Sequence, residues 1–160
     1  MNTATERSSD VDSEALNCVV IPVSGHRLLL PNVCVAEIVP GRRIRELKDS
    51  PTWCIGFVSW RGQNVPVVHY DGFNGGSAKP STARCLVIMN RSHNALGPPF
   101  YALAAEGLPR MVQVLEEDLT RDDASLSDGS ALAVKIGAEA AVIPDLGFVE
   151  QRVRDLIDLT

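Results

Sequence analysis

The sequence predicts an all-β protein that ends in one helix, and three observations lead to this fold class. Short apolar stretches recur along the 160 residues and are separated by turns rich in glycine and proline. The stretch from Trp53 to Asp71 has the pattern of two strands joined by a tight turn. Near the C-terminus, apolar residues recur at helical spacing instead. The number of strands does not by itself distinguish a sandwich from a barrel.

The first half of the chain is predicted to hold a hairpin, a short helical turn and two further extended segments. Residues 1–14 are polar, so we expect a disordered tail there and a folded domain over residues 15–160. The elements expected next are a hairpin of Asn17 to Val23 with Arg27 to Leu30, a helical turn from Pro31 to Ala36, an extended segment from Glu37 to Val39, and a loop from Gly41 to Ser50 with a short strand around Ile44.

The second half opens on the hairpin Ile55 to Tyr70 and a linker, Asp71 to Thr82, that is rich in glycine. Arg84 to Asn90 is a continuous apolar run, which predicts a strand buried on both faces. The remaining elements expected are strands at Phe100 to Ala105 and Met111 to Leu115, a surface loop from Glu116 to Gly129, strands at Ala131 to Ile136 and Ala140 to Ile143, and an amphipathic helix from Phe148 to Leu159 whose apolar stripe packs on the strands.

The hairpin holds the residues that are most informative about function. Arg61 to Asn64 is expected to turn the chain, with Gly62 supplying a positive φ without a Cβ clash. Pro66 cannot donate a ladder hydrogen bond, which predicts a free edge or a bulge at that point. Arg61 stands between two apolar strands, so its charge must reach water or a carboxylate.

Glu37 is a second single charge in an apolar strand segment, and we expect it to pair with Arg61. The pair could fix two segments in register, or it could order a binding surface, and these two roles are compatible. Apolar side chains could form a groove beside it. The candidates for this groove are Val35, Ile38, Val39, Leu108, Met111 and Val112.

The composition excludes several classes of function. The net charge of −5 argues against nucleic acid or an anionic membrane as the main partner, since both attract a basic face. No apolar run approaches the roughly 20 residues of a membrane-spanning helix. The polar start of the chain also lacks the apolar stretch of a signal peptide, so we expect a cytoplasmic protein.

The sequence carries no pattern that indicates catalysis, a cofactor or a metal. The histidines have no metal-ligand spacing, and no nucleophile elbow, dinucleotide or phosphate loop occurs. Cys18, Cys34, Cys54 and Cys85 lie among apolar residues without a C-x-x-C pair, and are interpreted as small buried hydrophobic residues. The alternative hypothesis is a small barrel enzyme or ligand-binding protein in which Cys54 and His69 converge on one pocket.

The hairpin resembles that of the CheW-like family, the adaptor module of bacterial chemosensory arrays. The resemblance rests on Gly56, on Arg61-Gly62, on Pro66-Val67-Val68 and, upstream, on the segment Val35 to Val39 with its glutamate. Downstream, Tyr101 to Val114 is similar to a strand, acidic-residue and strand passage of the family, with Glu106 where an aspartate is common. His69, also often an aspartate in the family, and Ala131 to Lys135 depart from its pattern.

The resemblance implies two small five-stranded β-barrels around a shared apolar core, followed by the helix. It implies a non-catalytic adaptor that couples methyl-accepting chemoreceptors to a CheA-type histidine kinase. The departures suggest an accessory member similar to the ChpC group, which serves type IV pili. The partner-binding residues that it implies here are Val35, Glu37, Ile38, Val39, Gly56, Arg61, Gly62, Glu106 and Leu108.

Overall fold

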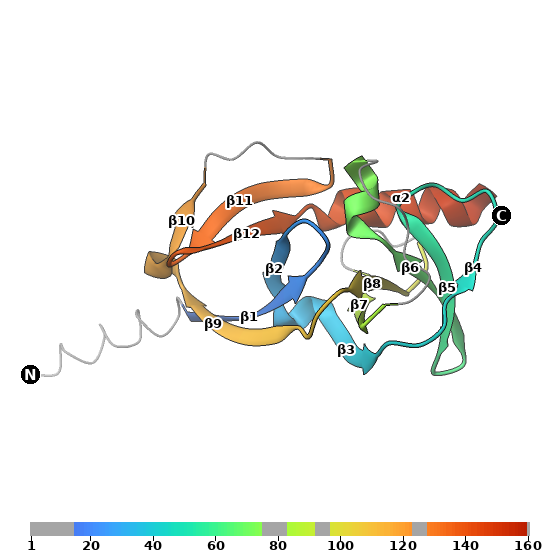
Figure 1. Cartoon of the computed structure of the whole chain (residues 1–160), viewed down its shortest axis with the longest axis horizontal. Helices are drawn as coiled ribbons and strands as arrows, with labels where there is room; N and C mark the ends of the chain where they lie inside the picture. The colour runs from blue at the N-terminus through green and yellow to red at the C-terminus, as the bar shows by residue number, and fades with distance from the viewer. Residues whose placement is uncertain (1–14, 75–82, 92–96, 123–127, 160) are drawn as a thin grey trace, which may run out of the picture.

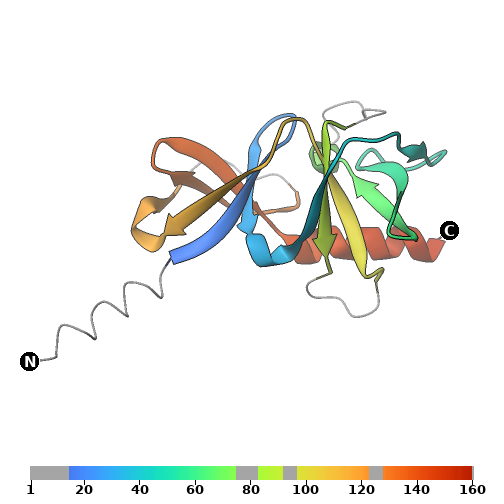
Figure 2. The same ribbon diagram turned by 90° about the horizontal axis from the view of Figure 1, so that it is seen from below.

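The computed structural model describes residues 15–74, 83–91, 97–122 and 128–159, which form two β-sheets and a C-terminal helix (Figure 1). The predicted tail, residues 1–14, lies outside the described residues, as do parts of the predicted linker and of the predicted loop 116–129. The sheets lie side by side along the long axis of the molecule. The helix α2 (Leu146–Leu159) begins at their junction and runs along the flank of the second sheet (Figures 1 and 2).

The first sheet joins the beginning of the chain to its end, and its strand order is β10-β11-β12-β2-β1-β9. Its strands are β1 (Ala15–Pro22), β2 (Arg27–Pro31), β9 (Arg110–Leu115), β10 (Leu119–Arg121), β11 (Ser130–Ile136) and β12 (Glu139–Pro144). The predicted first hairpin is present, with Val20 opposite Leu29, and β9 continues the sheet on the other side of β1.

The second sheet contains the middle of the chain, in the order β3-β7-β8-β6-β5-β4. Its strands are β3 (Val35–Pro40), β4 (Arg45–Glu46), β5 (Cys54–Trp60), β6 (Gln63–Val68), β7 (Cys85–Asn90) and β8 (Phe100–Ala105). A short 3-10 helix, η1 (Asn32–Cys34), carries the chain from β2 into β3, where a helical turn was expected. Strand β7 is buried from Cys85 to Met89, as its continuous apolar run predicted.

Three apolar cores hold the fold together. One core fills the interior of the first barrel, which the first sheet forms, around Val20 and Val134. Another fills the interior of the second barrel around Val58 and Leu86. The third lies between the sheets and contains residues of both, together with Val149 of α2 and its neighbours. The predicted fold class, two small β-barrels with a shared core and a terminal helix, is therefore confirmed. The short strands β4 and β10 bring each sheet to six strands, where five were expected.

The hairpin of β5 and β6 turns in two residues. Arg61 and Gly62 have φ angles of 49° and 76°, which is typical of a type I′ turn. We expected the turn to extend to Asn64, but Gln63 and Asn64 already pair with Trp60 and Ser59. Pro66 precedes the segment of β6 that pairs with β8, which begins at Val67, so its missing N–H leaves that ladder intact.

Two predictions about polar residues were wrong. Residues 116–129 were expected to be a loop, yet a 3-10 helix η3 (Glu116–Asp118) and strand β10 occur there, because Leu119 pairs with Ile136 of β11. The predicted amphipathic helix implies that charged residues of α2 face water, but Glu150 is 4% exposed and accepts a hydrogen bond of 3.1 Å from the Tyr101 hydroxyl. A buried carboxylate needs such a donor, which the helical spacing alone does not reveal.

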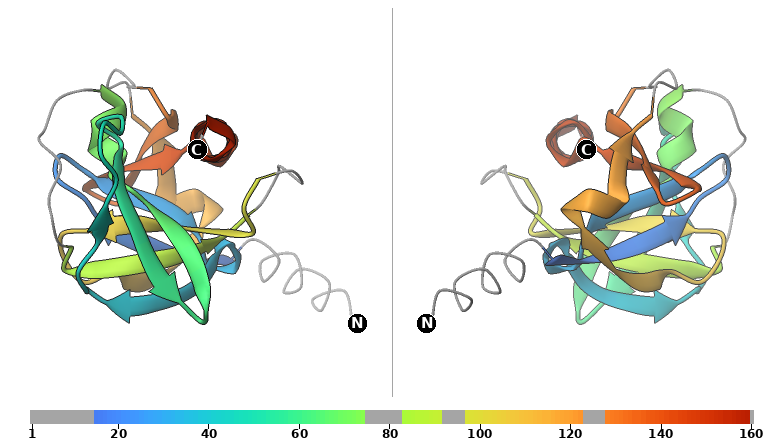
Figure 3. Two further views of the ribbon diagram at one scale, coloured as in Figure 1. Left: turned by 90° about the vertical axis from the view of Figure 1, so that its right-hand side faces the viewer. Right: turned by 90° about the vertical axis from the view of Figure 1, so that its left-hand side faces the viewer.

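The helix α2 lies to one side of the strands, as the views along the molecule show (Figure 3). Its predicted apolar stripe does pack on the barrels, through Val149 and Val153 in the shared core. Phe148 meets Phe73 of the 3-10 helix η2 (Tyr70–Asn74) edge to face, at 5.3 Å between ring centroids. Within the described residues, no helix is both long and apolar enough to cross a membrane.

Candidate partner-binding surface

The predicted pair of Glu37 and Arg61 is present on the second barrel. Glu37 Oε1 accepts hydrogen bonds from Arg61 Nη2 at 3.1 Å and from the Trp60 indole at 3.0 Å. The Arg61 guanidinium also lies over the Trp60 ring, 4.8 Å from its centroid. Because Glu37 is on the edge strand β3 and the other two belong to the hairpin, these contacts connect β3 to the tip of the β5–β6 hairpin.

This pair is on the surface, so the Arg61 guanidinium reaches both water and a carboxylate, the two alternatives expected for its charge. The Arg61 side chain is 68% exposed and that of Glu37 is 40% exposed. The reason is the two-residue turn, which puts Arg61 at the tip of the hairpin. A non-glycine residue with positive φ costs about 1 kcal/mol or more. The ion pair with Glu37 and the contact with the Trp60 ring stabilise the Arg61 side chain in this conformation and offset part of that cost.

The other predicted residues of this barrel differ in exposure. Ile38 is 38% exposed beside Glu37, whereas Val39 is 5% exposed and belongs to the interior of the barrel. Val35 is half-buried and packs against the shared core. Gly56 is buried, and a Cβ there would lie 2.0 Å from the carbonyl oxygen of Arg45. Val39 and Gly56 are therefore interior residues that determine the packing beneath this surface and are not themselves exposed on it.

Glu106 and Leu108 lie elsewhere, in the connection between β8 and β9. The Glu106 carboxylate accepts a hydrogen bond from the Ser24 hydroxyl, and its backbone N–H donates to Pro22 at 3.0 Å. Leu108 is 69% exposed. These contacts connect Glu106 to the β1–β2 turn of the first barrel. The structure therefore brings Glu37, Arg61 and Gly62 together and assigns Glu106 and Leu108 to a second position.

The residues of the expected apolar groove are only partly on the surface. Strands β3 and β9 lie on the same side of the molecule, the lower side in Figure 1, which faces the viewer in Figure 2. Met111 is 57% exposed there, while Val112 is half-buried in the first barrel. We therefore treat Ile38, Leu108 and Met111 as the exposed apolar members of the predicted set.

The two residues of the enzyme hypothesis are both buried. Cys54 is 0% exposed and His69 is 4% exposed. His69 lines a cavity of about 230 Å³ beside Arg84 and Glu106, and Cys54 is not among the lining residues. Cys18 and Cys85 are buried as well and Cys34 is half-buried, and burial raises the pKa of the Cys18 and Cys34 thiols. Cys18, Cys54 and Cys85 are therefore buried as predicted, whereas Cys34 is only partly removed from water.

Trp60 is the site residue that the sequence did not identify. An indole N–H that is largely removed from water usually finds an acceptor, and Trp60 is 6% exposed. Its position next to Arg61 was the available signal, since both side chains can reach one carboxylate only if the hairpin tip approaches β3.

The fold defines this molecule as a two-barrel β module. Its two small barrels share a core, a helix lies beside them, and a charged pair is exposed on the surface. The model of the CheW-like domain family matches residues 17–151. The chain therefore belongs to the CheW-like family. This membership supports a coupling adaptor in chemotaxis signalling, since the members of the family are non-catalytic scaffold proteins, and it gives the enzyme hypothesis no support.

The comparison with solved structures agrees with this assignment. The crystal structure of the scaffolding protein TtCheW from Thermoanaerobacter tengcongensis matches with a TM-score of 0.65 and 15% sequence identity. The match covers 82% of this chain and 84% of that chain. At this identity the likeness establishes the shared fold. The search of curated proteins found no match.

Proposed function

We propose that this protein is a non-catalytic adaptor that couples methyl-accepting chemoreceptors to a CheA-type histidine kinase in the cytoplasm. The observation that carries this proposal is the family match over residues 17–151. In such a mechanism the adaptor performs no chemistry. It binds two proteins at once, and the distance and angle between its two surfaces set the output of the kinase.

Two separate surfaces support this mechanism. The first combines the Glu37–Arg61 pair with exposed Ile38 of β3 and with Gly62, which is exposed at the hairpin tip of the second barrel. The second combines Glu106 with exposed Leu108 beside the first barrel. The shared core between the barrels would hold both surfaces in a fixed relation. We assign each surface to a different partner.

The experiment measures binding of the purified protein to the cognate kinase and, separately, to a receptor signalling fragment. We expect Ile38→Lys with Arg61→Glu to abolish one interaction, and Leu108→Glu to abolish the other. Leu159→Glu is the matched control, because Leu159 is 85% exposed at the end of α2. Cys54→Ala and His69→Ala should leave both interactions intact. The proposal fails if the folded wild-type protein binds neither partner, or if the two variants leave both interactions unchanged.

For the pathway, we propose a chemosensory system that controls type IV pili. The support is the departure of the chain from the family pattern at His69 and at Ala131 to Lys135. Deletion of the gene should then impair pilus-dependent surface motility and leave swimming unaffected. A defect confined to swimming would assign the protein to a flagellar system.

A further inference from the structure

Arginines gather at one end of the second barrel, although the chain as a whole is acidic. Arg42, Arg43 and Arg45 line a surface hollow of about 900 Å³, where three cationic side chains outnumber one acidic residue, Glu46. The net charge of the chain is −5. We call this feature the arginine hollow, defined by Arg42, Arg43 and Arg45. It shares no residue with the Glu37–Arg61 pair.

The backbone that carries these arginines is held firmly against the barrel. Ile44 is 3% exposed in the interior of the barrel, so Arg43 and Arg45 on either side of it point toward solvent. Gly41 donates its N–H to the carbonyl of Arg84 at 2.9 Å, and a Cβ on Gly41 would lie 1.7 Å from the carbonyl oxygen of Ala83. The segment therefore presents its charges from a fixed position.

Two of the three guanidinium groups are oriented by hydrogen bonds, and none of the three has an ion pair within the described part of the chain. Arg42 donates to the carbonyl of Ser59 at 3.1 Å, and Arg45 donates to the side-chain carbonyl of Asn64. Both acceptors are uncharged, and each guanidinium has further N–H donors. Arg61, by contrast, already pairs with a carboxylate. Oriented arginines with unused donors are well suited to bind carboxylates, because less side-chain entropy is lost on binding.

The hollow also borders a sheet edge. Strand β4 ends the strand order of the second sheet and pairs with β5 at Arg45–Phe57 and Glu46–Gly56. Its other side carries no strand within the described part of the chain. An extended peptide can add to such an edge through main-chain hydrogen bonds, with alternate side chains facing the neighbouring residues.

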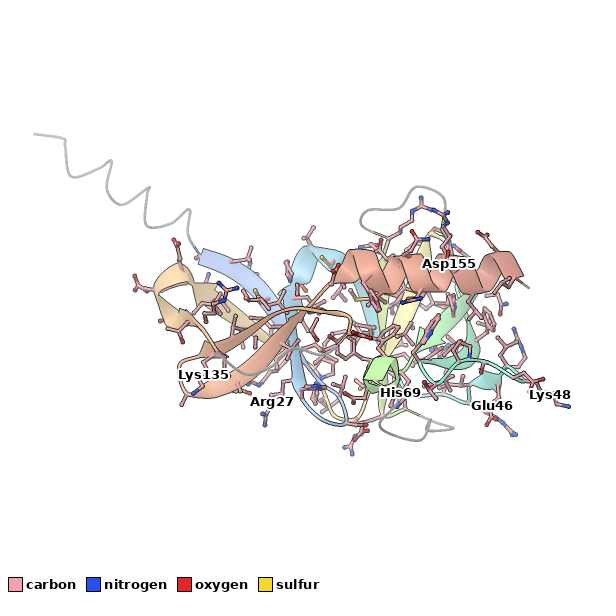
Figure 4. The ribbon with its side chains drawn as sticks, turned by 90° about the horizontal axis from the view of Figure 1, so that it is seen from above. Arg27, Glu46, Lys48, His69, Lys135 and Asp155 are labelled. Atoms are coloured by element: carbon pink, nitrogen blue, oxygen red, sulfur yellow. The ribbon has the colours of Figure 1, made fainter. Side chains whose placement is uncertain are left out.

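We propose that the arginine hollow binds an extended acidic segment of a partner protein, which adds to the edge of β4 and directs its carboxylates at Arg42, Arg43 and Arg45. This inference does not depend on the proposed coupling function. A protein segment fits better than nucleic acid, because the main-chain N–H and C=O groups of an extended peptide can pair with the edge of β4, and a nucleic acid has no such groups. Glu46 and Lys48 project from this same end of the molecule (Figure 4).

The probe is a fluorescent peptide of about eight residues with alternating glutamate and threonine. Its binding is measured by anisotropy at low and at physiological salt. Arg43→Glu with Arg45→Glu should weaken binding by about tenfold or more. The matched control is Arg121→Glu with Lys135→Glu, which changes the charge equally on exposed residues of the first barrel. Lys135 lies at the opposite end of the molecule (Figure 4), and Arg121 is on the strand that pairs with it. That control should change the affinity by less than about twofold.

Further measurements keep the proposal falsifiable. If Arg43→Glu with Arg45→Glu does not fold, Arg42→Gln with Arg43→Gln replaces it, since both side chains are exposed. Bound peptide should slow amide hydrogen exchange in β4. Absence of peptide binding, equal loss in the control pair, or equally tight binding of a single-stranded oligonucleotide of the same charge would overturn the proposal. Salt-sensitive dimerisation that the arginine variants abolish would overturn it too, because the occupant would then be a second copy of this chain.

Discussion

The Glu37 carboxylate lies 3.1 Å from the Arg61 guanidinium and connects residues that are 24 positions apart. Strand β3, which carries Glu37, is one edge of the second sheet, and Arg61 is at the tip of the hairpin formed by two other strands of that sheet. The contact therefore bridges segments that no backbone ladder joins. The contact holds the hairpin tip next to the strand that carries Glu37 and Ile38, so we expect any contribution to partner binding to be positional.

A double-mutant cycle on this pair should give a small coupling. Both side chains are exposed by 40% or more, so Glu37→Ala with Arg61→Ala should show a coupling of about 0.5–1 kcal/mol in urea unfolding. High salt should reduce it. Trp60→Phe should cost about 1 kcal/mol by removing the indole donor. A coupling near 3 kcal/mol would contradict the exposed geometry and indicate a buried pair.

Gly56 and Gly62 should respond very differently to alanine, although both belong to the hairpin. A Cβ on Gly56 would overlap the backbone of Arg45, whereas nothing lies within 4 Å of a Cβ on Gly62. Gly56→Ala should therefore displace β4 and cost about 3 kcal/mol or more. Gly62→Ala should cost about 1 kcal/mol, from its φ of 76° alone. Chemical denaturation measures both, and equal losses would contradict the steric explanation.

Much of this fold was predictable because its pattern is local. The hairpins, the buried strand β7 and the helix α2 follow from the spacing of neighbouring apolar residues and from turn residues. Strand β10 was not predictable in this way, because three residues become a strand only through pairing with β11. The burial of Glu150 likewise depends on Tyr101, which is 49 positions away.

In the candidate site too, some features were predictable from the local sequence and others depend on contacts that are distant in the sequence. The pairing of Glu37 with Arg61 could be predicted because each is a single charge in an apolar segment that needs a partner. The exposure of these two side chains could not be predicted, because it depends on whether the turn has two residues or four. A change of one residue in register reverses which face of a strand a side chain occupies. For the same reason the burial of Val39 and the role of Trp60 emerged only from the structure.

Ionisation of Tyr101 should make the protein less stable in alkali. Burial, and then the nearby Glu150 carboxylate, raise the pKa of Tyr101 well above its ordinary value. The contribution of the neutral phenol to the free energy of unfolding is therefore fully present below the unfolded pKa of about 10. It is lost as the pH rises beyond that value, because Tyr101 ionises more readily in the unfolded state. Each pH unit above about 10 should cost about 1.4 kcal/mol from this residue.

The variant Tyr101→Phe tests this explanation through the slope of stability against pH. It should cost about 1–2 kcal/mol at neutral pH, because the buried Glu150 loses one hydrogen-bond donor. Above about pH 10 its free energy of unfolding should fall less steeply than that of the wild type. Some alkaline slope will remain, since burial also raises the pKa of Tyr70. Identical slopes in urea unfolding at pH values from about 8 to 11 would contradict the assignment.

Glu139 should make the first barrel sensitive to acid. Its carboxylate accepts two hydrogen bonds from Arg110 of β9, one of 2.6 Å to Oε2, and lies 3.0 Å from the Arg27 guanidinium of β2. The hydrogen bond from Arg110, followed by the charges of Arg110 and Arg27, lowers the pKa of Glu139. Because the folded pKa is lowered, the stabilisation is present above the unfolded value of about 4.3 and is lost as the pH falls through the folded one.

Glu139→Gln should therefore cost about 0.5–1 kcal/mol at neutral pH, a small value because the side chain is 30% exposed and water screens the ion pairs. The difference from the wild type should shrink as the pH falls below the unfolded value of about 4.3, and it should vanish once the carboxylate is protonated in the folded state as well. Glu46→Gln, at an exposed position on the second barrel, is the control and should change stability by less than about 0.5 kcal/mol. Since Glu139 connects β12 to both β2 and β9, Arg110→Gln should reproduce most of the effect. A difference between wild type and Glu139→Gln that persists unchanged in acid would mean that the side chain stabilises by packing and not by its charge.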